Sequence, residues 1–329
     1  MIVEIALALA GLFLILKGSE WITDAAVPLA TFLDTTYIAV GLVLVSVLLS
    51  LPELMISVSA VMRGHEGIGV GVIIGSIIVN LGLIMGVSAI LRPLKVPRHV
   101  ITRDTVFMVV ATIVVSLIAF EDSQVTARDG VVFLLLFIPY LVNIYEQEKT
   151  LAMKERKKES DMITKALLFT GKLGGAEIVI HDSRVIFVAG VGMLIVGAEL
   201  FTGSLISFAG IFGIPELFIG LTLGALGPSI PNLAAALQAV RRGYDELAIS
   251  ETVGSNIFTL LITLGILALI HPFTIDSTTT MVTAPALLIV TVTFFVFSMR
   301  GIISRAAGFT LVTLYLLTLC AEYYFRIGI

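Results

Sequence analysis

The segment from Ser50 to Ala60 has the sequence SLPELMISVSA and lies inside an apolar run at residues 37–62. Pro52 and Glu53 stand side by side near the middle of this run. A proline removes one helical hydrogen bond and bends or breaks a helix. A carboxylate at the centre of a bilayer costs at least a few kcal/mol. The run is nevertheless long enough to span a membrane, so the segment predicts an interrupted transmembrane helix whose buried acid has a specific task.

The rest of the chain is equally apolar. Of its 329 residues, 58% are hydrophobic and 13% are charged, and the mean hydropathy is +1.08, whereas soluble proteins carry roughly 25% charged residues. The apolar runs are too long and too continuous for the alternating strands of a membrane barrel. We therefore predict an all-α integral membrane protein with ten transmembrane helices. The runs lie near residues 2–17, 37–62, 67–91, 104–120, 130–145, 185–208, 217–240, 247–270, 281–299 and 306–323.

The basic residues predict the orientation, because they concentrate on the cytoplasmic side of membrane proteins. The longest polar stretch, at 146–183, is rich in lysine, and residues 92–103 and the turns near 241 and 300 are also basic. Ten spans satisfy this pattern with both termini outside and the linker 146–183 in the cytoplasm. We thus expect a multi-pass protein of the plasma (cytoplasmic) membrane. A solvated loop explains the basic linker more simply than a nucleic-acid site, so we expect no nucleic-acid partner and infer no obligate protein partner.

The chain contains an internal repeat. An offset of 179 residues superposes residues 18–93 on 197–272 without a gap, so that SLPEL meets SIPNL and IIGSII meets TVGSNI. Five spans per copy reverse the direction of the second copy. The sequence predicts a first five-helix repeat at 1–145, the linker at 146–183 and a second, inverted repeat at 184–329, with helices 2 and 7 interrupted at Pro52 and Pro231. Inverted repeats with interrupted helices are typical of secondary transporters, whose substrate site lies near the middle of the membrane.

The polar residues near the two breaks are candidates for an ion-binding site. Ser76 and Asn80 lie four residues apart and share a helix face, as do Glu251 and Ser255 in the second copy. Oxygen ligands suit hard cations such as Na⁺ and Ca²⁺ and argue against zinc and copper. Metal contacts are expected above all from Glu53, Ser76, Ser255 and Glu251. The full candidate set is Ser50, Glu53, Ser76, Asn80, Ser229, Asn232, Glu251, Ser255 and Thr259.

No phosphate-binding loop, nucleophile triad or Cys/His spacing occurs in the sequence, so an enzyme has no support and no cofactor is expected. The partners are inorganic cations and the lipid bilayer. Glu20 and Glu199 match across the repeats near the ends of spans one and six. Anchoring at the membrane interface, or pairing with Arg63 or Arg242, is their expected role, and a gate at the mouth of the cavity is the alternative.

At these residues the chain resembles the calcium/cation antiporter superfamily, which includes the sodium/calcium exchangers. The segments SLPELMISVSA and SIPNLAAALQA fit the family's first motif, and GSIIVN and GSNIFT fit its second. The resemblance implies ten helices in two inverted repeats and an antiporter that extrudes Ca²⁺ against inward Na⁺ or H⁺ by alternating access. It implies Glu53 as the ion-binding carboxylate. The implied oxygen partners are Ser50, Ser76, Asn80, Ser229 and Ser255.

The second repeat departs from the family pattern. Asn232 replaces a glutamate, Thr259 replaces an acidic or amide residue, and Leu49 and Pro228 replace threonine-type residues. A Ca²⁺ site normally has at least two carboxylates. Glu251 could supply the missing charge; alternatively, Glu251 is solvated near the cytoplasmic end of its helix and interacts with the helix dipole. In that second case the protein would handle a monovalent cation or a different stoichiometry. A transport-incompetent, ion-binding homologue is a further alternative, and a channel is disfavoured.

Overall fold

The computed structural model describes residues 1–32, 46–121, 123–150 and 183–327. Most of them are helical because the bilayer offers no partners to backbone N–H and C=O groups, so each spanning segment must satisfy its own. Its first half contains α1 (Ile2–Phe32), α3 (Leu51–Met62), α4 (Glu66–Ile78), the π-helix η1 (Val79–Ile84), α5 (Met85–Leu91), β1 (Leu94–Lys95), α6 (Arg98–Val100), the π-helix η2 (Ile101–Thr105), α7 (Val106–Glu121), β2 (Gln124–Val125) and α8 (Ala127–Thr150).

The second half contains the same kinds of element in a similar order. They are α10 (Ser183–Phe212), α11 (Glu216–Ile219), the π-helix η3 (Gly220–Gly224), α12 (Ala225–Arg241), α13 (Asp245–Phe258), the π-helix η4 (Thr259–Thr263), α14 (Leu264–Ile270), β3 (Phe273–Thr274), the π-helix η5 (Thr279–Thr283), α15 (Ala284–Met299), β4 (Ile302–Ile303) and α16 (Arg305–Ile327).

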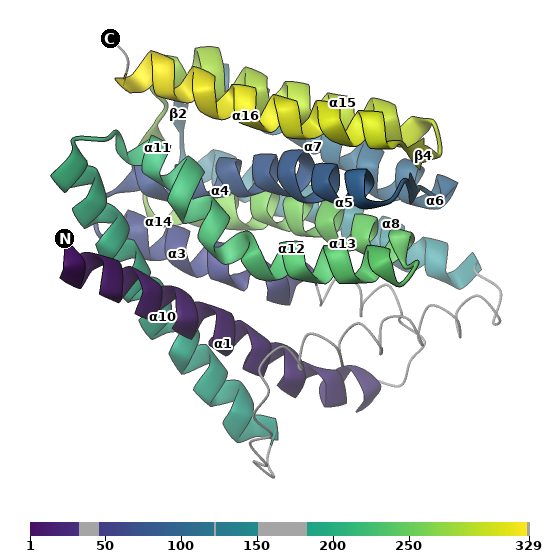
Figure 1. The fold of residues 1–329 in the computed structure, drawn as a ribbon, viewed down its shortest axis with the longest axis horizontal. Coiled ribbons are helices and arrows are strands. Elements are labelled where there is room, and N and C mark those ends of the chain that lie inside the picture. The colour runs from purple at the N-terminus through teal and green to yellow at the C-terminus, as the bar shows by residue number, and fades with distance from the viewer. Residues whose placement is uncertain (33–45, 122, 151–182, 328–329) are drawn as a thin grey trace.

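The predicted fold class is confirmed. Within the described ranges, nine helices are long and apolar enough to cross a membrane, and α3 is a shorter apolar helix. The span predicted at 37–62 includes residues 37–45, which lie outside the described residues, as does most of the linker predicted at 146–183. Figure 1 places both termini at the same end of the bundle, as an even number of crossings requires.

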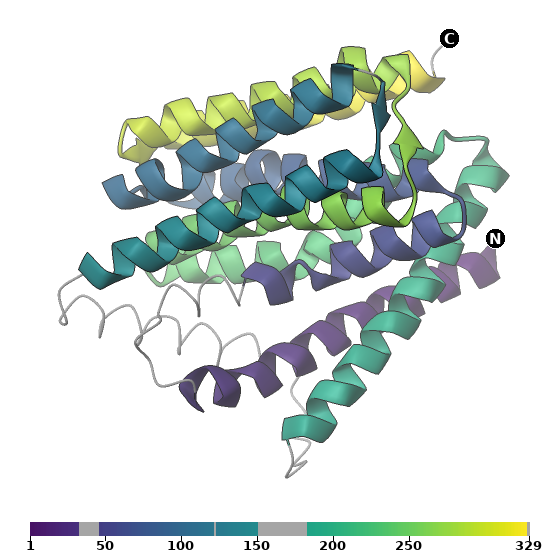
Figure 2. The same ribbon diagram turned by 180° about the vertical axis from the view of Figure 1, so that it is seen from behind.

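Two short strand pairs display the inversion of the repeats. β1 pairs with β4, and β2 pairs with β3, both antiparallel. The 179-residue offset carries β1 onto β3 and β2 onto β4 to within one residue. The pairs lie at opposite ends of the bundle, and the β2–β3 pair is seen at the end near the C-terminus in Figure 2. Each repeat therefore contributes one strand to each end of the molecule, in agreement with two halves of opposite direction.

Glycines allow α1 and α10 to cross closely. A Cβ atom at Gly18 would lie 2.7 Å from the carbonyl oxygen of Gly190, and one at Gly11 would lie 2.8 Å from that of Gly197. These distances are too short for a side chain, so the backbones touch directly. The offset relates Gly11 to Gly190 and Gly18 to Gly197. The two helices form a tilted pair beside the other helices in Figure 1.

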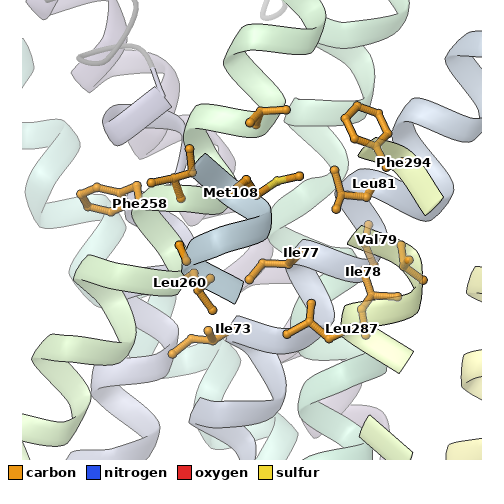
Figure 3. Close-up of a cluster of buried hydrophobic side chains, with 14 of the residues drawn as sticks. Ile73, Ile77, Ile78, Val79, Leu81, Met108, Phe258, Leu260, Leu287 and Phe294 are labelled. Atoms are coloured by element: carbon orange, nitrogen blue, oxygen red, sulfur yellow. The ribbon is translucent and has the colours of Figure 1, made fainter. Parts of the chain in front are cut away.

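The hydrophobic core lies around α4 and η1. Ile73, Ile77 and Leu81 are almost completely buried, and Figure 3 shows this group near Leu287 and Phe294 of α15. A second apolar cluster joins α1 and α10 to parts of α3 and α4. The polar residues of the next subsection lie on elements that border both clusters.

The structure gives the partners of three charged residues that were named above. Arg103, assigned above to a basic cytoplasmic segment, is buried in η2, where its guanidinium donates to both carboxylate oxygens of Asp104 at 2.7 and 2.8 Å. A buried arginine in a membrane helix needs such a partner. The pairing expected for Glu199 is confirmed, because Arg63 forms an ion pair with it. Glu20 instead pairs with Lys17 on its own helix, at 2.7 Å.

Candidate ion-binding site

The break at the beginning of α3 positions Glu53. Residues 46–49 are helical, the chain turns at Ser50, and α3 begins at Leu51. Pro52 has no N–H to donate and lies in the first turn of α3, where it is tolerated best. The Ser50 hydroxyl donates to the carbonyl oxygen of Ser46 at 2.8 Å and so satisfies a group next to the break. The interruption predicted for helix 2 thus lies directly before Pro52.

The irregularity of helix 7 has a different form. α12 continues through Pro228 and Pro231, and the irregular part is the π-helix η3 just before it. We expected the interruption at Pro231 itself. A π-helical turn shifts the hydrogen-bond pattern and lets a helix accommodate a bend without ending. The Thr222 hydroxyl also donates to the carbonyl oxygen of Phe218 at 2.6 Å. The irregularity of this helix therefore lies at residues 220–224, before both prolines, and not at Pro231.

Glu53 is buried without a normal hydrogen-bond partner. Its residue is 1% exposed, and neither carboxylate oxygen is paired. The Ser229 hydroxyl lies beside this carboxyl group, but it also forms no hydrogen bond of normal geometry. A buried acid without partners costs several kcal/mol, so this arrangement calls for a bound proton, water or cation.

Glu251 faces the same region. It is 6% exposed, and its Oε1 atom has no partner, while Oε2 accepts a long hydrogen bond of 3.5 Å from Thr252. It is close enough to Glu53 for the two charges to interact. Ser46, from the segment before the helix 2 break, donates to the backbone carbonyl of Glu251 at 3.3 Å. The alternative of a solvated Glu251 at a helix end is therefore wrong.

The two repeats meet through a pair of hydroxyl groups. Ser50 Oγ and Ser255 Oγ are 2.6 Å apart. The repeat offset relates Ser50 to Ser229 and Ser76 to Ser255, so a second pair between Ser76 and Ser229 would complete the symmetry. Instead, Ser76 donates to the carbonyl of Ile73 at 3.0 Å, and Ser229 is unpaired. The two halves of the site are thus in different states of hydrogen bonding.

Asn80 contacts Asn256, a residue that was not predicted from the sequence. Its Nδ2 donates to Oδ1 of Asn256 at 2.8 Å, while its own Oδ1 has no partner. Asn256 follows Ser255 and is almost completely buried. The first repeat has Ile77 at the matching position. An amide where the first repeat has an apolar residue was the available signal. Asn256 orients Asn80 so that its free carbonyl oxygen remains available.

Asn232, three residues after Ser229, has a buried side chain in which neither the nitrogen nor the oxygen is paired. Thr259, which matches Asn80, is buried at the beginning of η4. All nine predicted residues are therefore buried. Seven of the twelve buried, unpaired side-chain atoms found in the described residues belong to five of them: Glu53, Asn80, Ser229, Asn232 and Glu251.

This set can bind a hard cation. Its members offer carboxylate, amide and hydroxyl oxygens, and Glu53 and Glu251 can contribute two negative charges. Among the described residues there is no group of three or more His, Cys, Asp or Glu side chains that could hold a metal ion.

Comparison with known proteins extends over both halves of the chain. A family model described as sodium/calcium exchanger protein matches residues 3–145 and 183–324. The chain is 30% identical to sodium/calcium exchanger MaX1 of Methanosarcina acetivorans, covering 98% of this chain and 99% of that protein. It is 31% identical to inner membrane protein YrbG of Escherichia coli, covering 84% and 82%. A solved structure of the sodium-calcium exchanger NCX_Mj superposes with a TM-score of 0.63 at 27% identity, covering 97% and 98%.

Proposed function

Because the chain belongs to the sodium/calcium exchanger protein family, we propose that it is a secondary-active cation antiporter that exchanges Na⁺ or H⁺ for Ca²⁺. In this proposal Glu53 is the central ligand and Glu251 is the second carboxylate. The cations are substrates and not resident cofactors. The protein would act in the cytoplasmic membrane, with both termini outside and residues 146–183 inside.

The observation that carries this proposal is the cluster of unpaired oxygens on elements of both repeats. Glu53 and Asn80 come from the first repeat, and Ser229, Asn232 and Glu251 come from the second. Leaving such groups buried and unpaired is unfavourable, so a cation that enters among them replaces its hydration shell with these oxygens. Because the site is shared between the halves, a relative movement of the halves would expose it to each side in turn.

The charge of the site supports a divalent ion. Asn232 removes the carboxylate that the family has in the second repeat, but Glu251 brings one back within interaction distance of Glu53. With both ionised, the site has two negative charges, which match Ca²⁺ or more than one Na⁺. In exchange, each positive charge that moves inward through 100 mV releases about 2.3 kcal/mol. The membrane potential can therefore drive Ca²⁺ out when more than two Na⁺ or H⁺ enter.

A flux assay tests the function. The protein in phosphatidylcholine vesicles, loaded with Na⁺, should take up ⁴⁵Ca²⁺ when external Na⁺ is replaced by choline. Glu53→Gln should abolish this uptake, and Glu4→Gln in the first turn of α1 serves as the control that should retain it. Exchange at the wild-type rate in Glu53→Gln would refute the assignment of Glu53.

The same vesicles separate the alternatives. A monovalent cation/H⁺ exchanger would show K⁺- or Na⁺-driven pH changes without Ca²⁺ uptake. A transport-incompetent homologue would bind Ca²⁺ or Na⁺ in calorimetric titration and give no flux under any gradient. The combined departures at Asn232, Thr259, Leu49 and Pro228 motivate both tests.

A further inference from the structure

An apolar pocket of about 520 Å³ lies beside the candidate ion site. It is bordered by the α1–α10 pair on one side and by η1, η3 and α12 on the other. These elements all belong to candidate membrane spans. No part of the proposed exchange reaction requires this pocket.

We propose that this pocket holds one acyl chain of a membrane lipid. Among the described residues that line it, the side chains are aliphatic or aromatic, such as Leu12, Leu83 and Phe208, except for the one polar side chain of Ser229. A buried water needs two to four polar partners, and one hydroxyl group cannot supply them. The volume is that of a small-ligand pocket, so its chemistry and size suit a hydrocarbon chain.

The rim of the pocket identifies the bilayer as the source of the chain. Leu9, Leu223 and Ile230 are 63%, 47% and 49% exposed. They line the pocket and belong to candidate membrane spans, so their exposed apolar surface would contact lipid. The apolar surface therefore continues from the bilayer into the pocket. An acyl chain can enter sideways without crossing a polar layer, and filling the void restores the dispersion contacts that its lining lacks.

The bound chain would form part of the wall of the ion site. Ser229 lines the pocket and also lies beside the carboxyl group of Glu53, so one residue separates hydrocarbon from the proposed ligand. A chain at this position would keep water away from that side of Glu53 and strengthen its interaction with a cation. The binding of the chain does not depend on the proposed exchange activity.

Bromine-labelled lipids test the proposal through tryptophan fluorescence. Trp21 is the single tryptophan of the chain, so Trp21→Phe gives a background without tryptophan. Phe208→Trp then places the reporter in the pocket wall. Phe294→Trp is the reference for the core, because Phe294 is fully buried, and Phe309→Trp is the reference for lipid, because Phe309 is 61% exposed. Each variant is compared in phosphatidylcholine vesicles with and without brominated acyl chains.

Bromine should reduce the fluorescence of Phe208→Trp nearly as much as that of Phe309→Trp. Adding Ala8→Phe to the Phe208→Trp variant should fill the pocket, so that the loss of fluorescence caused by bromine falls toward that of Phe294→Trp. Ala8→Leu replaces Ala8→Phe if the larger side chain prevents folding. Ala6→Phe is the matched control, because Ala6 is an exposed residue of the same helix that does not line the pocket. A loss at the Phe294→Trp level, or one that pocket filling leaves unchanged, would overturn the proposal. Neither fluorescence comparison measures ion flux, so a failure of the lipid proposal is distinguishable from a failure of the proposed exchange function.

Discussion

Individual residues redistribute the negative charge in the candidate site. Where the family pattern has a second-repeat glutamate, this chain has Asn232, whose amide is buried and unpaired. Glu251, at a position that the first repeat fills with Val72, brings a carboxylate toward Glu53. Two acids in a shared buried space repel one another, and a cation relieves that repulsion. Two acids near each other in this site would therefore favour a bound cation, whether the second acid lies at position 232 on α12 or at position 251 on α13.

Moving the second carboxylate from position 251 to position 232 tests whether Glu251 takes the place of the missing glutamate. Glu251→Gln should weaken Ca²⁺ binding by roughly 2–5 kcal/mol, the cost of losing one member of a buried charge pair, or about 30-fold or more in affinity. Adding Asn232→Glu to this variant should restore binding in calorimetric titration. Gln238→Glu, on the same helix α12 but outside the site, should give no restoration. Unchanged affinity in Glu251→Gln alone would show that Glu251 is not a ligand.

At the scale of helices and connecting segments, the repeat places equivalent ion pairs at the two ends of the bundle, but their basic residues differ. Arg92 forms an ion pair with Asp245 between the end of α5 and the beginning of α13. The repeat offset carries this pair onto His271 and Glu66, whose atoms are 3.3 Å apart at the other end. An arginine is always charged, whereas a histidine is charged only when protonated. The two equivalent ion pairs therefore differ in their basic group, which is a guanidinium at one end and an imidazole at the other.

The crossing of α1 and α10 predicts a position-specific response to alanine. Gly197→Ala should destabilise the fold by about 1–3 kcal/mol, a typical cost of overpacking, because its Cβ would lie 2.8 Å from backbone atoms of α1. Gly192→Ala, five residues earlier on α10, should be neutral or slightly stabilising, since no atom lies within 4 Å. Thermal unfolding in detergent measures both. Equal melting temperatures would show that the helices do not cross at these glycines.

Asp276, in the segment before η5, predicts that the protein loses stability in acid. Burial opposes ionisation of Asp276, but Arg326 and the hydroxyl and N–H groups of Thr279 donate to its carboxylate and lower its pKa below the ordinary value of 3.8. A lowered pKa gives stability above the unfolded pKa, and this stability is lost as the pH falls through the folded pKa.

The melting temperature should therefore fall below about pH 4 more steeply in the wild type than in Asp276→Asn. The variant should already be less stable at neutral pH, because it lacks the carboxylate that accepts hydrogen bonds from Arg326 and Thr279. Parallel pH profiles from pH 6 to pH 3 would contradict the role of this carboxylate.

At the scale of the whole molecule, the charges indicate the orientation. The elements α5, α6 and β4 meet at the end opposite the termini (Figure 1), and the sequence beside them is basic, with Arg92, Lys95 and Arg300. Both termini and the acidic residues Glu66, Glu216 and Asp276 lie at the other end. The excess of arginine and lysine in cytoplasmic segments predicts that the termini face outward.

Cysteine labelling in intact cells tests this orientation. In a Cys320→Ser background, which removes the single cysteine, Ser277→Cys should react with a membrane-impermeant maleimide. Ser304→Cys, at the opposite end, should react only after the cells are opened. Both serines are exposed, so the comparison is matched. The reverse pattern would invert the topology.

The sequence predicts the helical membrane fold, the repeat and the oxygen chemistry of the site, because hydropathy, periodicity and self-similarity can be read along the chain without knowing its packing. It predicted nine candidate residues that all proved to be buried. The partner of Asn80 could not be foreseen, because Asn256 is 176 residues away and their approach depends on the packing of helices from both repeats. Tertiary structure also decided that Glu251 is buried, that Arg103 is buried against Asp104 and that helix 7 contains a π-helix. The first two depend on the rotation of a helix about its axis and the third on a shift in backbone hydrogen bonds, and only the packed neighbours of a helix determine either.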